Sequence, residues 1–297
     1  MNRSVVLVAP AKVNLTLEVL GRRPDGYHEL ASIFATIDLA DRVRVAPSRT
    51  LDVRTSPSVG VGPQDDLAAR AVRTLAHALG RDPTAYVRVR KRIPVAAGLG
   101  GGSSDAAAVL RGLVRVWRVS SIDVVDLAAR IGSDVPFFAS GASVALVSGR
   151  GERVDALPAP PELWIVLVRV NVRVPTANVF ASPRITFSDG SRSRAIAERL
   201  RNGSVNAQFL RAHLSNDLLP AAQEIAPQVA QARECALARG VELAMSGSGP
   251  SLFVPADDRA HALRLARKLR RAGLNARPYR LGIARAGPTD RGLSLYR

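Results

Sequence analysis

Four glycines stand within five positions of this chain, and two serines follow them directly. The stretch reads PVAAGLGGGSSDAA over residues 94–107. Glycine permits backbone conformations and close approaches that a side chain would prevent. The N–H groups at the start of a helix are unpaired and carry partial positive charge, and a serine there can cap the helix and also donate to an anion. The stretch therefore predicts a loop that binds phosphate groups, with a plain glycine-rich turn and serine cap as the alternative.

The spacing within this stretch excludes two common phosphate loops. A Walker A motif would close on Gly-Lys-Ser or Gly-Lys-Thr, which the stretch lacks. The dinucleotide pattern G-x-G-x-x-G fails at Ser103. The residues that could surround a phosphate group form one candidate set: Pro94, Val95, Ala96, Ala97, Gly98, Leu99, Gly100, Gly101, Gly102, Ser103 and Ser104.

Lysine is rare in this chain, and its positions are therefore informative. Lys12, Lys91 and Lys268 are the three lysines, whereas arginine is abundant throughout. A lysine ammonium is a compact charge that fits beside a carboxylate where the planar arginine fork would not. Lys12 is therefore a candidate for contact with reacting groups, although a solvated lysine at a strand end fits its position equally.

The elements that carry these residues follow from the spacing of apolar side chains. Alternation in VNLTLEVL predicts a strand over 13–20, and a Pro-Asp-Gly turn follows it. The glycine stretch lies between an expected strand at 86–89 and an expected helix at 103–117. The other expected strands are 5–8, 41–46, 51–55, 143–149, 164–170, 241–245, 252–254 and 276–281, and the other expected helices are 65–79, one capped by Ser120 or Ser121, 193–201, 205–213, 218–239 and 258–271.

A proline-rich segment divides the chain into two parts of similar length. In ALPAPPELW, over 156–164, the prolines oppose both helix and sheet. The expected domains are therefore 1–155 and 156–297. Strands mixed with single helices favour the α+β class.

Composition limits the classes of protein to consider. The chain of 297 residues has a net charge of +17, one cysteine and only 4% aromatic residues. No apolar run is long enough to span a membrane, so we expect a cytoplasmic protein that does not bind membranes. The excess of arginine is spread over both parts, and stacking platforms for single-stranded nucleic acid are scarce, so we expect no nucleic-acid partner. A basic balance also suits an anionic small substrate.

Several motifs in order along the chain identify a family resemblance. PVAAGLGGGSSDAA resembles the phosphate-loop motif of the GHMP kinases, the superfamily of galactokinase, homoserine kinase and mevalonate kinase. APAKVNLTLEVLGRRPDGYHEL and IGSDVPFF resemble motifs of one branch, the 4-diphosphocytidyl-2-C-methyl-D-erythritol kinases. VPTANVF and SNDLLPAA are similar to motifs of that branch in the second part, and AMSGSGPSLF is similar to the third superfamily motif.

The resemblance implies a fold and a reaction. The fold would be the two-domain GHMP kinase fold, with an N-terminal domain like domain 2 of ribosomal protein S5 and a ferredoxin-like C-terminal domain. The reaction would be ATP-dependent phosphorylation of the 2-hydroxyl of the cytidine-diphosphate-linked methylerythritol, a step toward isoprenoid precursors. Mg²⁺ would arrive with ATP. Ser104 could offer a hydroxyl to it, but the sequence identifies no metal ligand. A monomer or weak homodimer is expected.

The resemblance also assigns roles to individual residues. Lys12 and Asp134 would be catalytic: Asp134 would accept the proton of the hydroxyl, and Lys12 would keep it ionised and stabilise developing charge. An aspartate that merely caps a helix is the alternative for Asp134. The implied substrate-binding residues are Asn14 for the sugar alcohol, Tyr27 and Phe180 stacked on cytosine, His28 at the edge of the base, and Thr176, Gly247 and Ser248.

Two other functions remain open from the sequence. One is a GHMP kinase that acts on another small alcohol, such as a mevalonate-type substrate. An aromatic clamp formed by Tyr27, His28 and Phe180 would be of no use to a substrate without a nucleobase. The other is a basic RNA-binding protein, which would show salt-dependent RNA binding and no ATP turnover.

Overall fold

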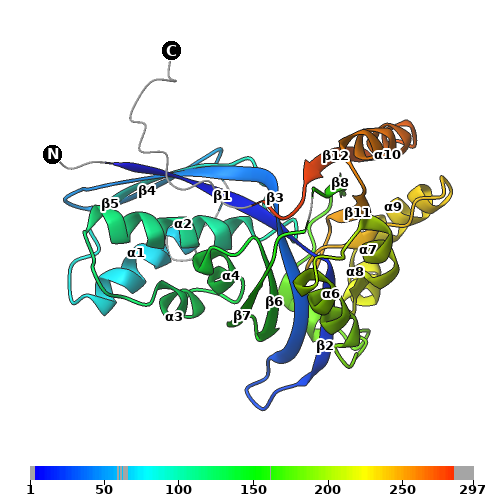
Figure 1. Ribbon diagram of the computed structural model, residues 1–297. Coiled ribbons are helices and arrows are strands. Elements are labelled where there is room, and N and C mark those ends of the chain that lie inside the picture. Colours follow the sequence, from blue (N-terminus) through cyan, green and yellow to red (C-terminus); the bar gives the residue numbers. More distant parts are fainter. Residues whose placement is uncertain (1–3, 59, 61, 63–65, 161, 284–297) are drawn as a thin grey trace.

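This computed structural model describes residues 4–58, 60, 62, 66–160 and 162–283. Its two longest strands pair with each other in an antiparallel arrangement. They are β1 (Val5–Asn14) and β3 (His28–Ala46), and β3 extends far enough to reach the C-terminal sheet, where Ile37 bridges to Leu281 (Figure 1). Within the described residues, eight strands form this first sheet. Its other strands are β2 (Thr16–Arg22), β4 (Leu51–Ser56), β5 (Ala85–Arg90), β6 (Val144–Gly149), β7 (Arg153–Leu157) and β9 (Ser215–Asn216).

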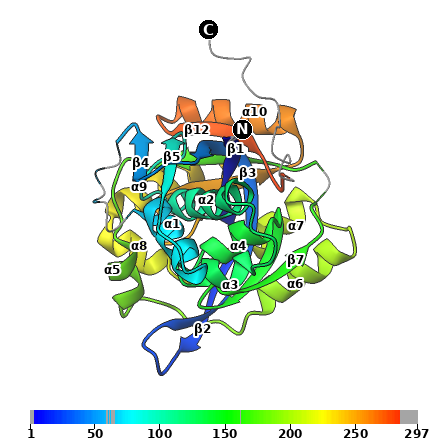
Figure 2. The same ribbon diagram turned by 90° about the vertical axis from the view of Figure 1, so that its left-hand side faces the viewer.

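Helices cover one face of the first sheet. They are α1 (Leu67–Ala78), α2 (Gly101–Val116), α3 (Val124–Ala129) and α4 (Val135–Ser140). In Figure 2, α2 lies between α1 and α4, and it packs on β1 and β3. Gly112 permits this close packing, because a Cβ there would lie 2.7 Å from Cγ2 of Val45. The start of α2 is thereby fixed against the sheet.

The C-terminal part is a second, antiparallel sheet with helices. Its strands are β8 (Trp164–Arg169), β10 (Ala244–Met245), β11 (Leu252–Ala256) and β12 (Asn275–Arg280), in the order β10-β11-β8-β12. With α10 (Arg259–Arg271) between β11 and β12, this is the ferredoxin-like arrangement. The other helices are α5 (Thr176–Ala181), α6 (Ser191–Arg201), α7 (Ala207–His213), α8 (Leu219–Ile225) and α9 (Pro227–Leu237). The expected α+β class, with a ferredoxin-like C-terminal part, is therefore confirmed.

The two parts share a hydrophobic core. Leu15, between β1 and β2, and Ile33 of β3 pack in one cluster with Ile165 and Phe253 of the second sheet. The expected linker over 156–164 falls mostly between the end of β7 and the start of β8. The boundary at residue 155 stays a prediction. Among the described residues, no helix is both long and apolar enough to cross a membrane.

Several expected elements were wrong in extent. The helix expected over 218–239 is two helices, because Pro227 has no N–H to continue the first and begins the second. The strand expected over 241–245 covers only Ala244–Met245. Residues 28–40 belong to β3 but were not expected as strand, and Pro10 lies inside β1 at a shift of register. Asp65, in the helix expected over 65–79, and the C-terminal arginine-rich segment lie outside the described residues.

Candidate active site

A cavity of about 960 Å³ lies between the glycine stretch, β1, the loop before α4 and the second part of the chain. Every site residue predicted from the sequence lines it, with the exception of Ser104. The predicted residues that line it are Lys12, Asn14, Tyr27, His28, residues 94–103, Asp134, Thr176, Phe180, Gly247 and Ser248. Residues up to 236 positions apart in sequence, from Lys12 to Ser248, are thus brought to one site.

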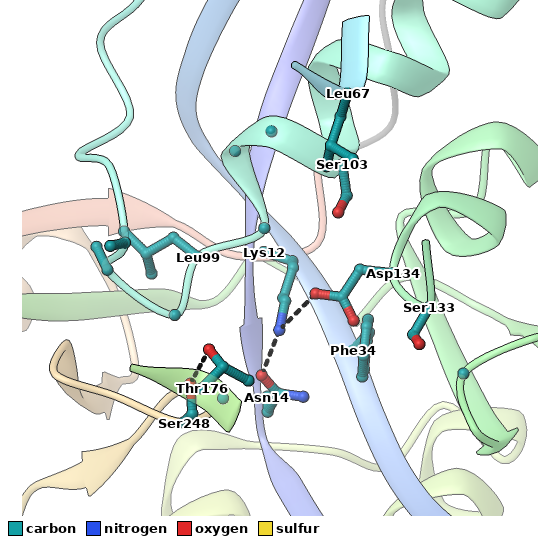
Figure 3. Close-up of a pocket in the computed structure, with 18 of the residues that line it drawn as sticks. Lys12, Asn14, Phe34, Leu67, Leu99, Ser103, Ser133, Asp134, Thr176 and Ser248 are labelled. Atoms are coloured by element: carbon teal, nitrogen blue, oxygen red, sulfur yellow. Dashed lines mark hydrogen bonds and ion pairs between the residues drawn. The ribbon is translucent and has the colours of Figure 1, made fainter. Parts of the chain in front are cut away.

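Lys12 and Asp134 form an ion pair in the middle of this cavity. Figure 3 shows the ammonium of Lys12 between the side chains of Asp134 and Asn14. Nζ of Lys12 lies 3.3 Å from Oδ2 of Asp134 and donates to Oδ1 of Asn14 at 2.7 Å. It also lies 4.5 Å from the centre of the Phe34 ring. The side chain of Lys12 is 4% exposed and that of Asp134 is 30% exposed, so the carboxylate is the partner that reaches the open cavity.

Asp134 occupies the N-cap position of α4, but its side chain does not cap the helix. Its carboxylate accepts no hydrogen bond from the N–H groups of that helix. The Gly-Ser turn before it and Pro136 after it direct the side chain toward Lys12 instead. Capping, the alternative that the sequence left open for Asp134, is thus absent from the structure.

Asn14 holds Lys12 in place from the same strand. Residues two apart share a face of a strand, so both side chains point into the cavity. Nδ2 of Asn14 donates to Oγ of Ser32 at 3.0 Å, and its backbone N–H donates to Oγ of Ser246 at 3.3 Å. Asn14 is 1% exposed. Its amide is engaged on both sides, which fixes the direction of the oxygen that Lys12 contacts.

Two glycines of the glycine loop, the stretch over residues 94–103, are required by their protein neighbours. A Cβ on Gly98 would lie 2.8 Å from the carbonyl oxygen of Gly249, in the loop after β10. A Cβ on Gly100 would lie 2.9 Å from Cε2 of Phe138 and 3.1 Å from Cγ of Lys12. Gly98 and Gly100 also have φ of +71° and +68°, which favour glycine. The loop is therefore packed tightly against both Lys12 and the second domain.

The two serines after the loop were expected to cap α2, and this was wrong. Gly100 is the cap residue, and no side chain caps the helix. Ser103 lies in the first turn and lines the cavity, as Figure 3 shows. Ser104 is 1% exposed, and its Oγ has no hydrogen-bond partner among the described residues. Ser103, rather than Ser104, presents its hydroxyl to the cavity.

A second buried lysine beside the loop was missed from the sequence. Nζ of Lys91 lies 2.5 Å from Oδ2 of Asp41 and 2.7 Å from Oδ2 of Asp105. Burial opposes the charge of Lys91, but the two carboxylates outweigh it and raise its pKa. Burial raises the pKa of Asp105 to about 7, although Lys91 opposes the shift. The rarity of lysine in this chain could have pointed to Lys91 as well, but it was used only to single out Lys12.

Aromatic side chains line the end of the cavity away from the loop. The rings of His28 and Phe180 lie 5.6 Å apart at 35°. Tyr27 is 55% exposed, and the guanidinium of Arg150 lies 4.9 Å from its ring centre. Burial lowers the pKa of His28, and the charge of Arg22 lowers it further, so the neutral ring is favoured. Tyr27 and Phe180 both line the cavity, and Phe180 packs on His28.

Thr176 and Ser248 close the cavity on the side of the second domain. Their hydroxyl oxygens lie 2.8 Å apart. Ser246, two residues before Ser248, donates from Oγ to the carbonyl oxygen of Gly98 at 2.9 Å. The loop after β10 therefore contacts both the glycine loop and the start of α5.

Comparison with known proteins agrees with this architecture. The model of the GHMP kinases N terminal domain matches residues 66–142, and the model of the GHMP kinases C terminal matches residues 194–275. A 4-diphosphocytidyl-2-C-methyl-D-erythritol kinase from Gloeobacter violaceus is 40% identical over 267 residues, which is 88% of each chain. The enzyme of the same name from Bacillus subtilis is 38% identical, over 82% of this chain and 86% of the relative.

Solved structures extend the comparison to the fold. The crystal structure of a 4-(cytidine 5'-diphospho)-2C-methyl-D-erythritol kinase is 37% identical and superposes with a TM-score of 0.75, covering 93% of this chain and 99% of the other. A homoserine kinase from Cytophaga hutchinsonii superposes with a TM-score of 0.71 at 17% identity over 96% of each chain, which shows the shared fold alone. This chain belongs to the GHMP kinases, ATP-dependent small-molecule kinases, and within them to the family of the 4-diphosphocytidyl-2-C-methyl-D-erythritol kinases.

Proposed function

We propose that this chain transfers the γ-phosphoryl group of ATP to the 2-hydroxyl of 4-diphosphocytidyl-2-C-methyl-D-erythritol, giving the 2-phosphate and ADP on the way to isoprenoid precursors. The observation that carries the proposal is the Lys12–Asp134 pair, which stands in one cavity with the glycine loop and the aromatic group of His28 and Phe180. The relatives that carry the name of this kinase support the same substrate.

Phosphoryl transfer depends mainly on alignment and on stabilising charge. The triphosphate would rest on the backbone of residues 94–103 and the start of α2, where N–H groups face the cavity. The acceptor is a tertiary alcohol, so a base would help it. Asp134 accepts the proton of the 2-hydroxyl while the oxygen of that hydroxyl bonds to the γ-phosphorus. The bond from the γ-phosphorus to ADP breaks, and ADP leaves. Lys12 keeps Asp134 ionised and offsets charge on the transferring group.

The remaining residues would orient the acceptor. Tyr27 and Phe180 would contact the faces of the cytosine, and His28 would hydrogen-bond its edge. Thr176, Gly247 and Ser248 would border the substrate from the second domain. Asn14 would hold the ammonium of Lys12 and contact the sugar alcohol. A mevalonate-type substrate has no base for this aromatic end, which favours the cytidine compound over that alternative.

Mg²⁺ fits this cavity as a companion of ATP. Among the residues that the structure describes, no three His, Cys, Asp or Glu side chains come together as a metal site. Magnesium is commonly held by one or two carboxylates, waters and the phosphates of its nucleotide. Ser103, which lines the cavity, would supply a protein oxygen, and the ion would neutralise charge on the phosphates. We further propose that the protein works in the cytoplasm as a monomer or weak homodimer and binds no nucleic acid.

The proposal is tested with Asp134→Asn. The variant keeps the shape of the side chain but cannot accept the proton, so kcat with ATP and the cytidylyl substrate should fall by about 10²–10⁴-fold. Binding of a non-hydrolysable ATP analogue, measured by calorimetry, should change little. Turnover like that of the wild type would exclude Asp134 as the base. Absence of turnover by the wild type with this substrate would exclude the proposed reaction.

A further inference from the structure

A second cavity, of about 430 Å³, lies wholly in the C-terminal part. Its lining residues come from α7, α8, α9, α10, β11, the short strands β9 and β10 and the turns beside them. These helices and β11 lie together on one side of Figure 1. None of its lining residues lines the active-site cavity. Much of its wall is apolar, with Leu219, Leu243, Val254 and Leu265 among the side chains. Its volume falls in the range of about 300–1,000 Å³ that small-molecule sites occupy.

The polar groups of this C-terminal cavity include one unpaired cation. Arg233 donates from Nε to the carbonyl oxygen of Leu243 at 3.0 Å, which fixes the direction of its guanidinium. Among the described residues, no carboxylate pairs with Arg233. Oγ of Ser215 is buried in the wall and has no hydrogen-bond partner there. This hydroxyl is shielded from the cavity, so the guanidinium of Arg233 is the group that the acceptor atoms of a ligand would reach.

The other charged groups of the wall are already paired or exposed. Arg211 donates from Nη1 to the carbonyl oxygen of Pro255 at 2.9 Å, and its Nη2 lies 3.8 Å from Asp257. Oδ2 of Asp257 also lies within hydrogen-bond distance of Nδ1 of His261, at 2.7 Å. Glu242 is exposed and forms no ion pair among the described residues. Arg233 is thus the arginine of the lining that has no carboxylate partner among the described residues, which favours an anion.

A single short strand connects this cavity to the active site. Ser215 and Asn216 form β9, which pairs with Thr16 and Leu17 of β2, the strand that follows the strand of Lys12 in the chain. Nδ2 of Asn216 donates to the carbonyl oxygens of Met245 and Gly247, at 2.9 Å each. Gly247 lines the active-site cavity, whereas Ser215 and Met245 line the C-terminal cavity. A ligand in the C-terminal cavity would therefore contact the two segments that hold the active-site loop.

We propose that the C-terminal cavity binds a small amphipathic anion, whose acidic group pairs with Arg233 and whose short apolar body lies against the leucine-lined wall. Its occupation changes the affinity of the active site through Asn216 and the loop that contains Gly247. The anion is a carboxylate or a phosphate monoester, since both accept the paired donors of an arginine. The proposal does not depend on which alcohol the kinase phosphorylates.

Calorimetric titration of the full chain tests the site, with the active site first saturated by a non-hydrolysable ATP analogue. The probes are hexanoate and hexyl phosphate, with hexanol as the neutral comparison. We expect one anion bound per chain, with hexanol binding at least tenfold more weakly. Arg233→Met keeps most of the apolar stem and removes the charge, so it should weaken binding of the anion at least tenfold. Arg233→Lys should restore part of the loss. Arg239→Met, an exposed neighbour outside the cavity wall, is the matched control and should bind like the wild type.

Coupling is tested by titrating the ATP analogue with and without the better probe. The affinity for the analogue should change at least twofold, and the analogue should change the affinity for the probe by the same factor, because coupling free energies are reciprocal. Stronger binding of hexanoate would identify the site as one for carboxylates, and stronger binding of hexyl phosphate as one for phosphate monoesters. Absence of binding, equal binding by Arg233→Met, or binding that leaves nucleotide affinity unchanged would each overturn the proposal.

Discussion

Lys12 is held on several sides before any ligand arrives. Asp134 and Asn14 contact its ammonium, Phe34 lies beneath it, and Gly100 leaves room for its stem. This enclosure suits a narrow side chain that ends in one compact charge. A guanidinium is wider and directs its donors within one plane. The position therefore selects lysine in a chain that otherwise uses arginine.

Lys12→Arg should therefore impair catalysis while the charge is kept. We expect kcat to fall by about 10²–10³-fold, the effect of misplacing one charge-stabilising donor. Affinity for a non-hydrolysable ATP analogue should change by less than about threefold, because the loop N–H groups remain. Steady-state kinetics and calorimetry measure the two effects. Lys268→Arg, at an exposed position of α10, is the control. A fully active Lys12→Arg enzyme would refute the argument from shape.

Asp105 should make stability depend on pH in a specific window. Burial raises its pKa from 3.8 to about 7, so between these values the folded chain holds a proton that the unfolded chain has released. The free energy of unfolding should then fall as pH rises from about 4 to 7, by up to about 1.4 kcal/mol per pH unit from this group. Lys91, whose pKa is raised, titrates above the window.

Asp105→Asn should flatten that pH dependence. Urea unfolding at several pH values from 4.5 to about 7.5 would measure the slope in both proteins. Asp82→Asn, at an exposed site, should follow the wild type. Parallel curves for Asp105→Asn and the wild type would show that Asp105 does not hold the proton.

The contrast between Lys12 and Lys91 shows what could be predicted at the scale of residues. Lys12 lies in a motif, and its partner Asp134 lies in another, so the resemblance suggested the pair. Lys91 stands 50 positions from Asp41 and 14 from Asp105. Neither aspartate has a pattern around it that predicts a contact with lysine. Long-range ion pairs of this kind depend on strand pairing and helix packing that the local sequence does not specify.

At the scale of elements, the start of α2 depends on Gly100. This residue caps the helix in a left-handed conformation, with φ of +68°, and its Cα faces Phe138 and Lys12. Gly102, two residues on, has no such requirement, since a Cβ there would make only an ordinary contact of 3.4 Å with Leu67. The two glycines thus offer a matched pair within one helix turn.

Gly100→Ala should destabilise the protein, and Gly102→Ala should not. A side chain in the left-handed region costs about 1–2 kcal/mol, and displacement of Phe138 or Lys12 adds to it. Alanine at Gly102 lies inside the helix, where it is favoured over glycine by up to about 1 kcal/mol. Urea midpoints would measure both changes. Equal midpoints for the two variants would indicate that the loop can shift without cost.

The elements themselves were predictable where the apolar pattern was regular. The strand at 51–55 and the helix at 258–271 lie within one residue of β4 and α10. The first part of β3 was missed because residues 31–37 are all buried, which removes the alternation of a strand exposed on one face. The break at Pro227 was overlooked because the helical pattern of apolar residues continues past it.

At the scale of the whole molecule, the two parts are joined by more than the chain that links them. Strand β9 comes from the C-terminal part but pairs with β2 of the first sheet. Gly98 of the glycine loop packs directly on the backbone of Ser246 and Gly249. Such contacts between distant segments depend on how the parts dock, which neither motifs nor periodicity reveal. The active site is therefore a property of the docked pair of domains.

Ser246 is the residue at which this docking can be tested. Its hydroxyl is completely buried, donates to the carbonyl oxygen of Gly98 at 2.9 Å and accepts from the N–H of Asn14 at 3.3 Å. It therefore joins the second domain to the glycine loop and to the strand of Lys12. Ser246→Ala leaves two buried backbone groups without this partner, so the free energy of unfolding should fall by about 1–3 kcal/mol.

The kinetic result separates a docking role from a purely local one. If Ser246 aligns the two domains, Ser246→Ala should raise the KM values of both ATP and the acceptor, because each is contacted by one of the segments that it joins. Ser204→Ala, on an exposed turn of the second domain, should change neither stability nor kinetics. A variant that loses stability but keeps both KM values would mean that Ser246 supports the fold of its own loop alone. The two domains would then hold their alignment through the shared apolar cluster of Leu15, Ile165 and Phe253.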